Sequence, residues 1–275
     1  MPIGTPFHPE LMQHCESLSI KDWAGYYCFK TYHTSHEAEY FAIRHAAGLI
    51  DVSPLFKYEV KGKDAGRFLD RIMVKPVSNL KPGRVTYLCW CDDQGKMLDD
   101  GTVTRMADDH FRVTAAEPSL YWFSKFTRGL DVTLADVTDD LGALAVQGPV
   151  SRDLLNDVTG GAVTDLKFFG MTETHIGSHG VWITRTGYTG DLGYEVWVDR
   201  PNAVDVYREI HRAGQKFGAM PCGLDAMDVA RVEAGFIMNG VDYFSAHHCF
   251  VESRKSTPYE LGLGWTVKLD REPFV

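Results

Sequence analysis

The sequence lacks the features that mark several large classes of protein. Its 275 residues contain no apolar run long enough to cross a bilayer, and the N-terminal stretch has no basic segment followed by an apolar one. The formal net charge is -9, and the sequence contains no block of Lys or Arg. Both features argue against a surface that binds nucleic acid or an anionic membrane. The sequence therefore predicts a cytoplasmic protein that has neither nucleic acid nor membrane among its partners.

Cysteine and histidine show no spacing that predicts a disulfide framework or a metal site. The six cysteines contain no Cys-x-x-Cys pair, and a chain of this length needs no disulfides to hold a core. His247, His248 and Cys249 are adjacent, but no second cluster lies at the spacing that zinc requires. We expect reduced thiols, mostly in the core, and no metal.

The common catalytic motifs are also missing. The sequence has no P-loop, no H-E-x-x-H and no G-x-S-x-G. Three glycines occur at a spacing of three, namely Gly187, Gly190 and Gly193. They lie between two predicted strands, whereas the glycines of a dinucleotide-binding fingerprint lie between a strand and a helix, so this stretch is not such a fingerprint. The chemistry must therefore come from residues outside these motifs.

Hydrophobic periodicity predicts an α+β fold with mainly antiparallel sheets. Alternating segments at 84–91, 96–106 and 110–116 are joined by short polar turns and read as a three-stranded meander. A hairpin at 171–187 turns at Gly177 to Gly180, and the glycine-rich stretch that follows adds a third strand. Further strands are expected at 56–60, 131–137 and 142–147, and helices at 63–73, 118–126, 151–158, 201–218 and 223–236.

Two helices are predicted with a specific buried face. Thr34 and Glu37 form a possible capping box for a helix that Gly48 would close. Its apolar stripe at helical spacing comprises Ala38, Phe41, Ala42 and His45. The helix at 201–218 would bury Val204, Tyr207, Ile210 and Phe217.

Charged residues inside apolar segments are the remaining candidates for function. Asp99 and Asp100 are consecutive in a predicted strand, so one carboxylate must face the packed side unless the pair lies at a surface edge or a bulge. Arg105, five residues along the same strand, should face away from Asp100. Glu195 and Arg231 likewise have apolar neighbours. Each of these groups could instead be part of a structural ion pair.

Six blocks of sequence, taken together and in order, resemble the aminomethyltransferase family (the T-protein of the glycine cleavage system) and its folate-dependent demethylase relatives. The blocks are GLIDVSPLFKYEVKG, CDDQGKMLDDGTV, VQGP, TRTGYTGDLGYEVWV, CGLDAMDVARVEAG and TPYELGLGWTVKLD. The resemblance covers the chain from about Glu37 to its end. It implies a folate-binding fold with a central ligand hole and one-carbon transfer at N5 of tetrahydrofolate.

The resemblance also implies roles for individual residues. Glu195 would accept hydrogen bonds from the N3–H and the 2-amino group of the pterin, two donors that match a carboxylate's two oxygens. The glycines beside it would let the chain turn tightly against the ligand. Arg231 would help to hold the folate, and Asp100 matches the essential aspartate of the family. The aromatic contacts to folate would be Tyr87, Tyr188 and Trp265.

The role of Asp100 also has a physical argument. As N5 attacks the methylene carbon and ammonia departs, positive charge develops, and a fixed carboxylate shielded from water stabilises that charge better than water does. The predicted cofactor is tetrahydrofolate. The donor would be a small molecule or a group carried on a lipoyl carrier protein, which is a possible partner.

The sequence departs from the family in the part expected to face the donor. Pro54 stands in DVSPLFK where the family has a histidine, and the entry segment at 21–33 differs from the usual pattern. The family continues into a C-terminal barrel domain, which we expect the fold of this chain to lack. We expect two discontinuous subdomains, one formed by about 1–50 with 140–245 and the other by 51–139 with 246–275.

Three functions therefore stay open. The leading one is an aminomethyltransferase-like transferase that uses tetrahydrofolate. The second is a tetrahydrofolate-dependent O- or S-demethylase of a small methylated compound. The third is a folate-binding module without catalysis, and if the charged residues are only an ion-pair network, there is no folate site.

Overall fold

The computed structural model describes residues 1–271 and 274, and the chain forms two compact units. Unit 1 comprises Met1–Pro54 and Asp139–Phe236, and unit 2 comprises Leu55–Thr138 and the segment from Ile237 onward. The last change of unit thus follows Phe236, whereas the sequence analysis placed it after residue 245. The fold is α+β and its sheets are mainly antiparallel, as the sequence predicted.

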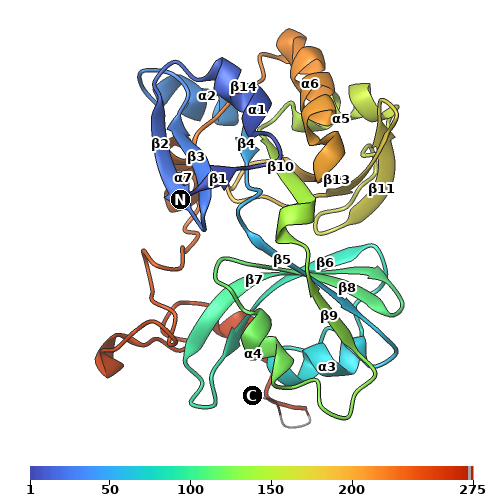
Figure 1. Cartoon of the computed structure of the whole chain (residues 1–275), viewed down its shortest axis with the longest axis vertical. Helices are drawn as coiled ribbons and strands as arrows, with labels where there is room; N and C mark the ends of the chain where they lie inside the picture. The colour runs from blue at the N-terminus through green and yellow to red at the C-terminus, as the bar shows by residue number, and fades with distance from the viewer. Residues whose placement is uncertain (272–273, 275) are drawn as a thin grey trace. The chain divides into compact units, whose positions relative to one another are not determined.

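Unit 1 contains a six-stranded sheet in the order β11-β12-β13-β10-β4-β14, in which only β14 and β4 pair in parallel. The strands are β4 (Gly48–Asp51), β10 (Leu141–Gln147), β11 (Met171–Ile176), β12 (His179–Thr184), β13 (Gly193–Asp199) and β14 (Met220–Pro221). Helices α5 (Ser151–Thr159) and α6 (Ala203–Gly214) pack against one another and contact β13 (Figure 1). Every residue of the central strand β10 is buried.

A smaller sheet completes unit 1. It has the order β1-β3-β2, formed by β1 (Ile3–Gly4), β2 (Ser19–Trp23) and β3 (Tyr26–Thr31). Three helices accompany it: α1 (His8–Leu11), α2 (Glu37–His45) and α7 (Leu224–Glu233), of which α7 packs on β3 (Figure 1).

Unit 2 is built on one five-stranded antiparallel sheet in the order β6-β7-β8-β5-β9. Its strands are β5 (Phe56–Lys61), β6 (Arg84–Cys91), β7 (Met97–Ala107), β8 (His110–Ala115) and β9 (Thr133–Asp136). Helices α3 (Ala65–Ile72) and α4 (Leu120–Ser124) lie against this sheet (Figure 1) and share its core through Phe68, Leu69 and Phe123. The predicted meander is therefore confirmed as β6, β7 and β8.

The buried face of α2 was predicted wrongly. The N-cap is His36 and no side chain caps it, so the capping box does not form. Ala38, Phe41 and His45 are exposed, and Phe41 and His45 stack on each other with ring centroids 5.8 Å apart. The helix instead buries Glu39, Ala42 and Ile43, and Gly48 belongs to β4.

The Glu39 carboxylate explains why a charged residue takes the buried position. It accepts hydrogen bonds from the backbone N–H groups of Tyr32 and Gly223, both at 2.7 Å, and from the Thr31 hydroxyl. A buried carboxylate with several such donors is stabilised without a cation. In α6, Tyr207 and Ile210 are buried as predicted, Val204 and Phe217 are half-buried, and Val206 takes a core position that the sequence analysis did not assign.

All six cysteines are free thiols, and four of them are buried, namely Cys28, Cys89, Cys91 and Cys222. None of the described helices has the length and apolar character needed to span a bilayer.

Candidate functional site

The two consecutive aspartates of unit 2 lie in the interior strand β7. Asp99 pairs with Trp90 and Asp100 with Cys89 across the β6–β7 ladder, and the register shifts at the residue before Asp99. The surface-edge interpretation is therefore wrong, whereas a bulge does lie next to the pair. Asp99 is fully buried and Asp100 is half-buried, because consecutive residues of a strand face opposite sides.

Asp99 is held by donors from two segments. The backbone N–H groups of Ala116 and Glu117 both donate to its Oδ2 at 2.8 Å, and the Asn239 amide donates to its Oδ1 at 2.8 Å. Burial, followed by the neighbouring charge of Asp100, raises the pKa of Asp99 to about 8. These contacts give Asp99 a structural position inside unit 2.

Asp100 is held by two phenol hydroxyls. Tyr243 donates to its Oδ1 at 2.5 Å, and Tyr87 donates to its Oδ2 at 2.8 Å. Burial raises the pKa of Asp100, and the two tyrosine hydrogen bonds partly oppose that rise. Within residues 1–271 and 274 no cation forms an ion pair with Asp100, and Arg105 donates instead to the carbonyls of Ser78 and Leu80, as its predicted orientation requires.

Tyr243 was missed by the sequence analysis. It is 2% exposed and lies in the irregular segment after Phe236, where no periodic pattern marks a buried residue. An isolated tyrosine among apolar and polar neighbours gives no signal that its hydroxyl reaches a carboxylate 143 positions earlier. Only the packing of this segment on β7 reveals the contact.

Two aromatic residues predicted for folate binding lie together beside Asp100. The rings of Tyr87 and Trp265 stack with centroids 6.1 Å apart and an interplanar angle of 27°. Trp265 belongs to a short 3-10 turn, Gly264–Thr266, and is 61% exposed. Unit 2 thus brings together Tyr87, Asp100 and Trp265 of the predicted site.

Glu195 lies in β13 of unit 1, opposite Ala145 and Thr184 on the neighbouring strands. Its Oε2 accepts hydrogen bonds from the hydroxyls of Thr186 at 2.6 Å and Thr184 at 3.4 Å. No other residue of the described chain bonds to the carboxylate, which leaves Oε1 available to a donor. Burial raises the pKa of Glu195, and the two threonines partly oppose the rise.

The glycine-rich turn before Glu195 makes room for a side chain of the protein itself. A Cβ at Gly187 or Gly193 would come within 1.9 or 2.1 Å of the Gln147 amide oxygen. Gln147 is fully buried, donates to the carbonyls of Thr186 and Tyr194, and accepts from the Thr189 hydroxyl. The structure therefore gives these two glycines a reason within the protein, close approach to Gln147, and close approach to a ligand stays a prediction.

Arg231 and Tyr188 meet through Phe236. Arg231 is 3% exposed, pairs with Asp228 at 2.7 Å and donates to the Phe236 carbonyl at 3.0 Å. The Tyr188 and Phe236 rings stack with centroids 5.7 Å apart. Arg231 thus organises the end of α7 through bonds to the chain itself.

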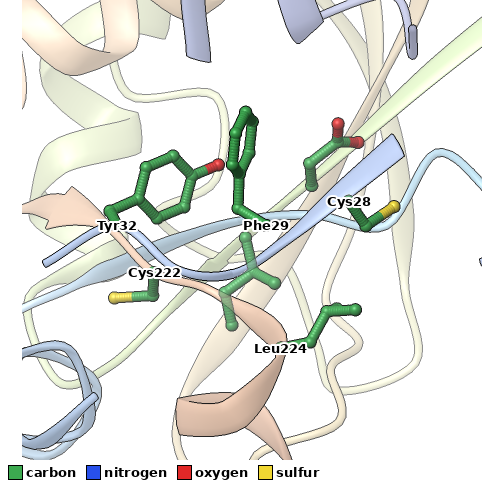
Figure 2. Close-up of a pocket in the computed structure, with 7 residues that line it drawn as sticks. Cys28, Phe29, Tyr32, Cys222 and Leu224 are labelled. Carbon is green, nitrogen blue, oxygen red and sulfur yellow. The ribbon is translucent and has the colours of Figure 1, made fainter. Parts of the chain in front are cut away.

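The cavities described within unit 1 do not include the predicted site residues. One is an enclosed space of about 10 Å³, room for about one water molecule, next to Tyr32, Asp51 and the thiols of Cys28 and Cys222 (Figure 2). A second, more open hollow of about 250 Å³ lies between the β11–β12 turn and α6. Across the described residues no group of three or more His, Cys, Asp or Glu side chains is placed to hold a metal ion.

Comparisons with known proteins agree with this fold. The GCVT N-terminal domain family matches residues 12–271. The chain is 34% identical over 275 residues to the aminomethyltransferase of Anoxybacillus flavithermus, covering 98% of this chain and 71% of that protein. It is also 34% identical to the Bacillus subtilis aminomethyltransferase, covering 87% of this chain and 65% of that protein.

A solved structure has a similar fold. The glycine cleavage system aminomethyltransferase T from Bartonella henselae matches with a TM-score of 0.85 at 25% identity, over 98% of this chain and 70% of that chain. The fold and these matches define a folate-dependent transferase of the T-protein type. The chain belongs to the aminomethyltransferase family, which uses tetrahydrofolate as its one-carbon acceptor, and it spans about two thirds of the length of these relatives.

Proposed function

We propose that this chain transfers a one-carbon unit to N5 of tetrahydrofolate in an aminomethyltransferase-like reaction, with Asp100 as its catalytic carboxylate. The observation that carries the proposal is the setting of Asp100: a half-buried carboxylate oriented by two tyrosines, with no cation of the described chain paired to it. Two structural carboxylates that form no ion pair among the described residues, Glu39 and Asp99, each accept from two or more backbone N–H groups, whereas the donors to the Asp100 carboxylate are two phenol hydroxyls. A positive charge that develops during the reaction would be the partner of Asp100.

Glu195 is proposed to recognise the pterin. The N3–H and the 2-amino group are two donors on one edge, and Oε1 of Glu195, which accepts from neither threonine, has two lone pairs to accept them. The half-buried carboxylate lacks a cation among the described residues, so these two donors would also compensate its charge. In unit 1, Tyr188 would supply aromatic surface and Arg231 would help to hold the folate. In unit 2, the stacked Tyr87 and Trp265 rings would supply aromatic surface.

The proposed chemistry at Asp100 follows from its hydrogen bonds. Tetrahydrofolate, when bound, supplies N5 as the nucleophile. The Asp100 carboxylate stabilises the cation that grows on the donor carbon as ammonia leaves, and the two tyrosine hydroxyls hold both carboxylate oxygens so that little reorganisation is needed. Completing the transfer also breaks the bond from that carbon to the lipoyl sulfur, and the two protons lost by the folate nitrogens go to ammonia and to the lipoyl thiol. Asp99 faces the other side of β7, where it accepts hydrogen bonds from backbone N–H groups, and it takes no part in the reaction.

The proposed donor is an aminomethyl group carried on a lipoyl carrier protein, which would then be a partner of the chain. The second candidate, demethylation of a small O- or S-methyl compound, is favoured by one observation: Pro54 replaces the histidine expected after Ser53 and has no imidazole to offer a donor. Assaying tetrahydrofolate-dependent turnover with aminomethylated lipoyl carrier and with a panel of methyl ethers and thioethers distinguishes the two.

Asp100→Asn tests the catalytic assignment, because it keeps the shape of the side chain and removes its charge. We expect turnover to fall by about 10²-fold or more while folate affinity changes little, since the lost interaction is made mainly in the transition state. Turnover, folate affinity and melting temperature are measured on one preparation. Equal losses of affinity and turnover, or a loss of stability alone, would remove Asp100 from catalysis and favour a binding module.

A further inference from the structure

A lysine ammonium lies at the end of the aromatic pair of unit 2. Lys75 Nζ is 5.6 Å from the centre of the Trp265 ring, a cation–π contact. The backbone N–H of Lys268 donates to the Val74 carbonyl at 2.9 Å, which brings a second lysine alongside. Over residues 1–271 and 274, neither ammonium has a carboxylate within 4 Å.

The two lysines form a local positive site in a chain of formal net charge -9. Lys75 is half-buried, and its burial, together with the charge of Lys268, lowers the pKa of the Lys75 ammonium. Some other partly buried cations of this unit have anionic partners, such as Arg112 with Glu59 and Lys255 with Glu252. An uncompensated, partly desolvated ammonium is stabilised when an anion binds beside it.

The ammonium is connected to Asp100 through aromatic surface. Lys75 lies over Trp265, Trp265 stacks on Tyr87, and the Tyr87 hydroxyl donates to Asp100. Trp265 is 61% exposed, so part of its indole is accessible to a ligand. A molecule bound along it would have a reacting group near Asp100, an aromatic middle part over the rings and an anionic end at Lys75.

We propose that Lys75, assisted by Lys268, binds the glutamate carboxylates of the folate. A folate consists of a pterin, an aminobenzoyl ring and a glutamate tail, which is the order of groups that Asp100, the Tyr87–Trp265 pair and Lys75 would receive. The proposal rests on the proposed function and extends it to the specificity of the same site. Lys75 acts as a point charge with three donors, and Lys268 extends the positive field to additional glutamates.

Calorimetry with three ligands tests the proposal: tetrahydropteroate, which has no glutamate, tetrahydrofolate and its triglutamate. The full chain is compared with Lys75→Gln, Lys268→Gln and, as a matched control, Lys81→Gln, an exposed lysine of the same unit. We expect Lys75→Gln to weaken tetrahydrofolate about tenfold and tetrahydropteroate less than about twofold. Lys268→Gln should weaken the triglutamate more than the monoglutamate, and Lys81→Gln should change none.

Other outcomes overturn the proposal in different ways. If the unaltered chain binds tetrahydrofolate and Lys75→Gln weakens it no more than tetrahydropteroate, Lys75 does not bind the tail. If Lys75→Gln leaves folate affinity intact and raises the KM of a carboxylate-bearing donor, the anion belongs to the donor. If the unaltered chain binds none of the three ligands, the proposed function itself is wrong. Melting temperatures on the same samples show that each variant is folded.

Discussion

The two units each place a half-buried carboxylate on an interior strand, but the two carboxylates are held differently. Glu195 in unit 1 receives both of its hydroxyl donors on Oε2, so Oε1 can accept from a ligand. Asp100 in unit 2 has a tyrosine hydroxyl on each oxygen and a second aspartate beside it. The difference suggests that one carboxylate is arranged for recognition and the other for holding a fixed charge.

The largest effect is expected from a substitution of Glu195, which tests whether this carboxylate and Asp100 have different roles. Glu195→Gln removes the charge and turns one acceptor into a donor, so we expect folate binding to weaken by about 2–5 kcal/mol, as when one partner of a desolvated charged pair is lost. Turnover at saturating folate should fall much less, unlike in Asp100→Asn. Calorimetry measures the affinity, and Glu173→Gln on the exposed face of β11 is the matched control. Unchanged affinity in a folded Glu195→Gln protein would refute the recognition role.

A smaller effect should come from the turn that precedes Glu195. Gly187→Ala places a Cβ within 1.9 Å of the Gln147 amide oxygen, so we expect the free energy of unfolding to fall by about 1–3 kcal/mol. Adding Gln147→Ala should make the combined loss less than additive, because the clash is then gone. Urea denaturation measures both.

Gly180→Ala is the control for that turn, since a Cβ there meets no atom within 4 Å and its φ is not positive. If Gly180→Ala and Gly187→Ala lower stability equally, the contact with Gln147 is not the cause.

The smallest predicted effect is a shift in the pH dependence of activity, which tests how Tyr243 acts on Asp100. Tyr243→Phe removes the hydroxyl that donates to Asp100 Oδ1, so the pKa of Asp100, already raised by burial, should rise further. Because the carboxylate form is the active one, activity is lost as pH falls through that pKa. The acid limb of the pH–rate profile should therefore move to higher pH, with about tenfold lower turnover on that limb and recovery at higher pH.

Tyr58→Phe is the control for this prediction. Tyr58 is fully buried in the same unit, and its hydroxyl accepts from the Ser119 backbone N–H, so its loss should lower stability without moving the profile. A uniform loss of turnover by Tyr243→Phe at every pH would mean that Tyr243 supports the fold and does not adjust the charge of Asp100.

The fold could be predicted where interactions are local along the chain. Strands β6, β7 and β8 follow one another through short turns, so period-two alternation and the turn residues were enough to place them. Helix α2 was assigned as a helix but with the wrong face, because the donors that hold Glu39 come from Tyr32 and from Gly223, 184 residues away. Periodicity ranks a glutamate as exposed unless such donors are known.

The sequence by itself determined the α+β class, most strand and helix positions, and the candidates Glu195 and the Asp99–Asp100 pair, because a charged residue inside an apolar strand is visible without coordinates. The choice of Asp100 within the pair came from the resemblance to the family. Only the tertiary structure decided that Asp99 is the buried aspartate of the pair and that Tyr243 and Tyr87 hold Asp100. It also decided that the Lys75 ammonium lies over the Trp265 ring. It also showed that Gln147 occupies the space left by Gly187 and Gly193. Hydrogen bonds and ring contacts between distant segments depend on packing, and packing leaves no periodic trace in the chain.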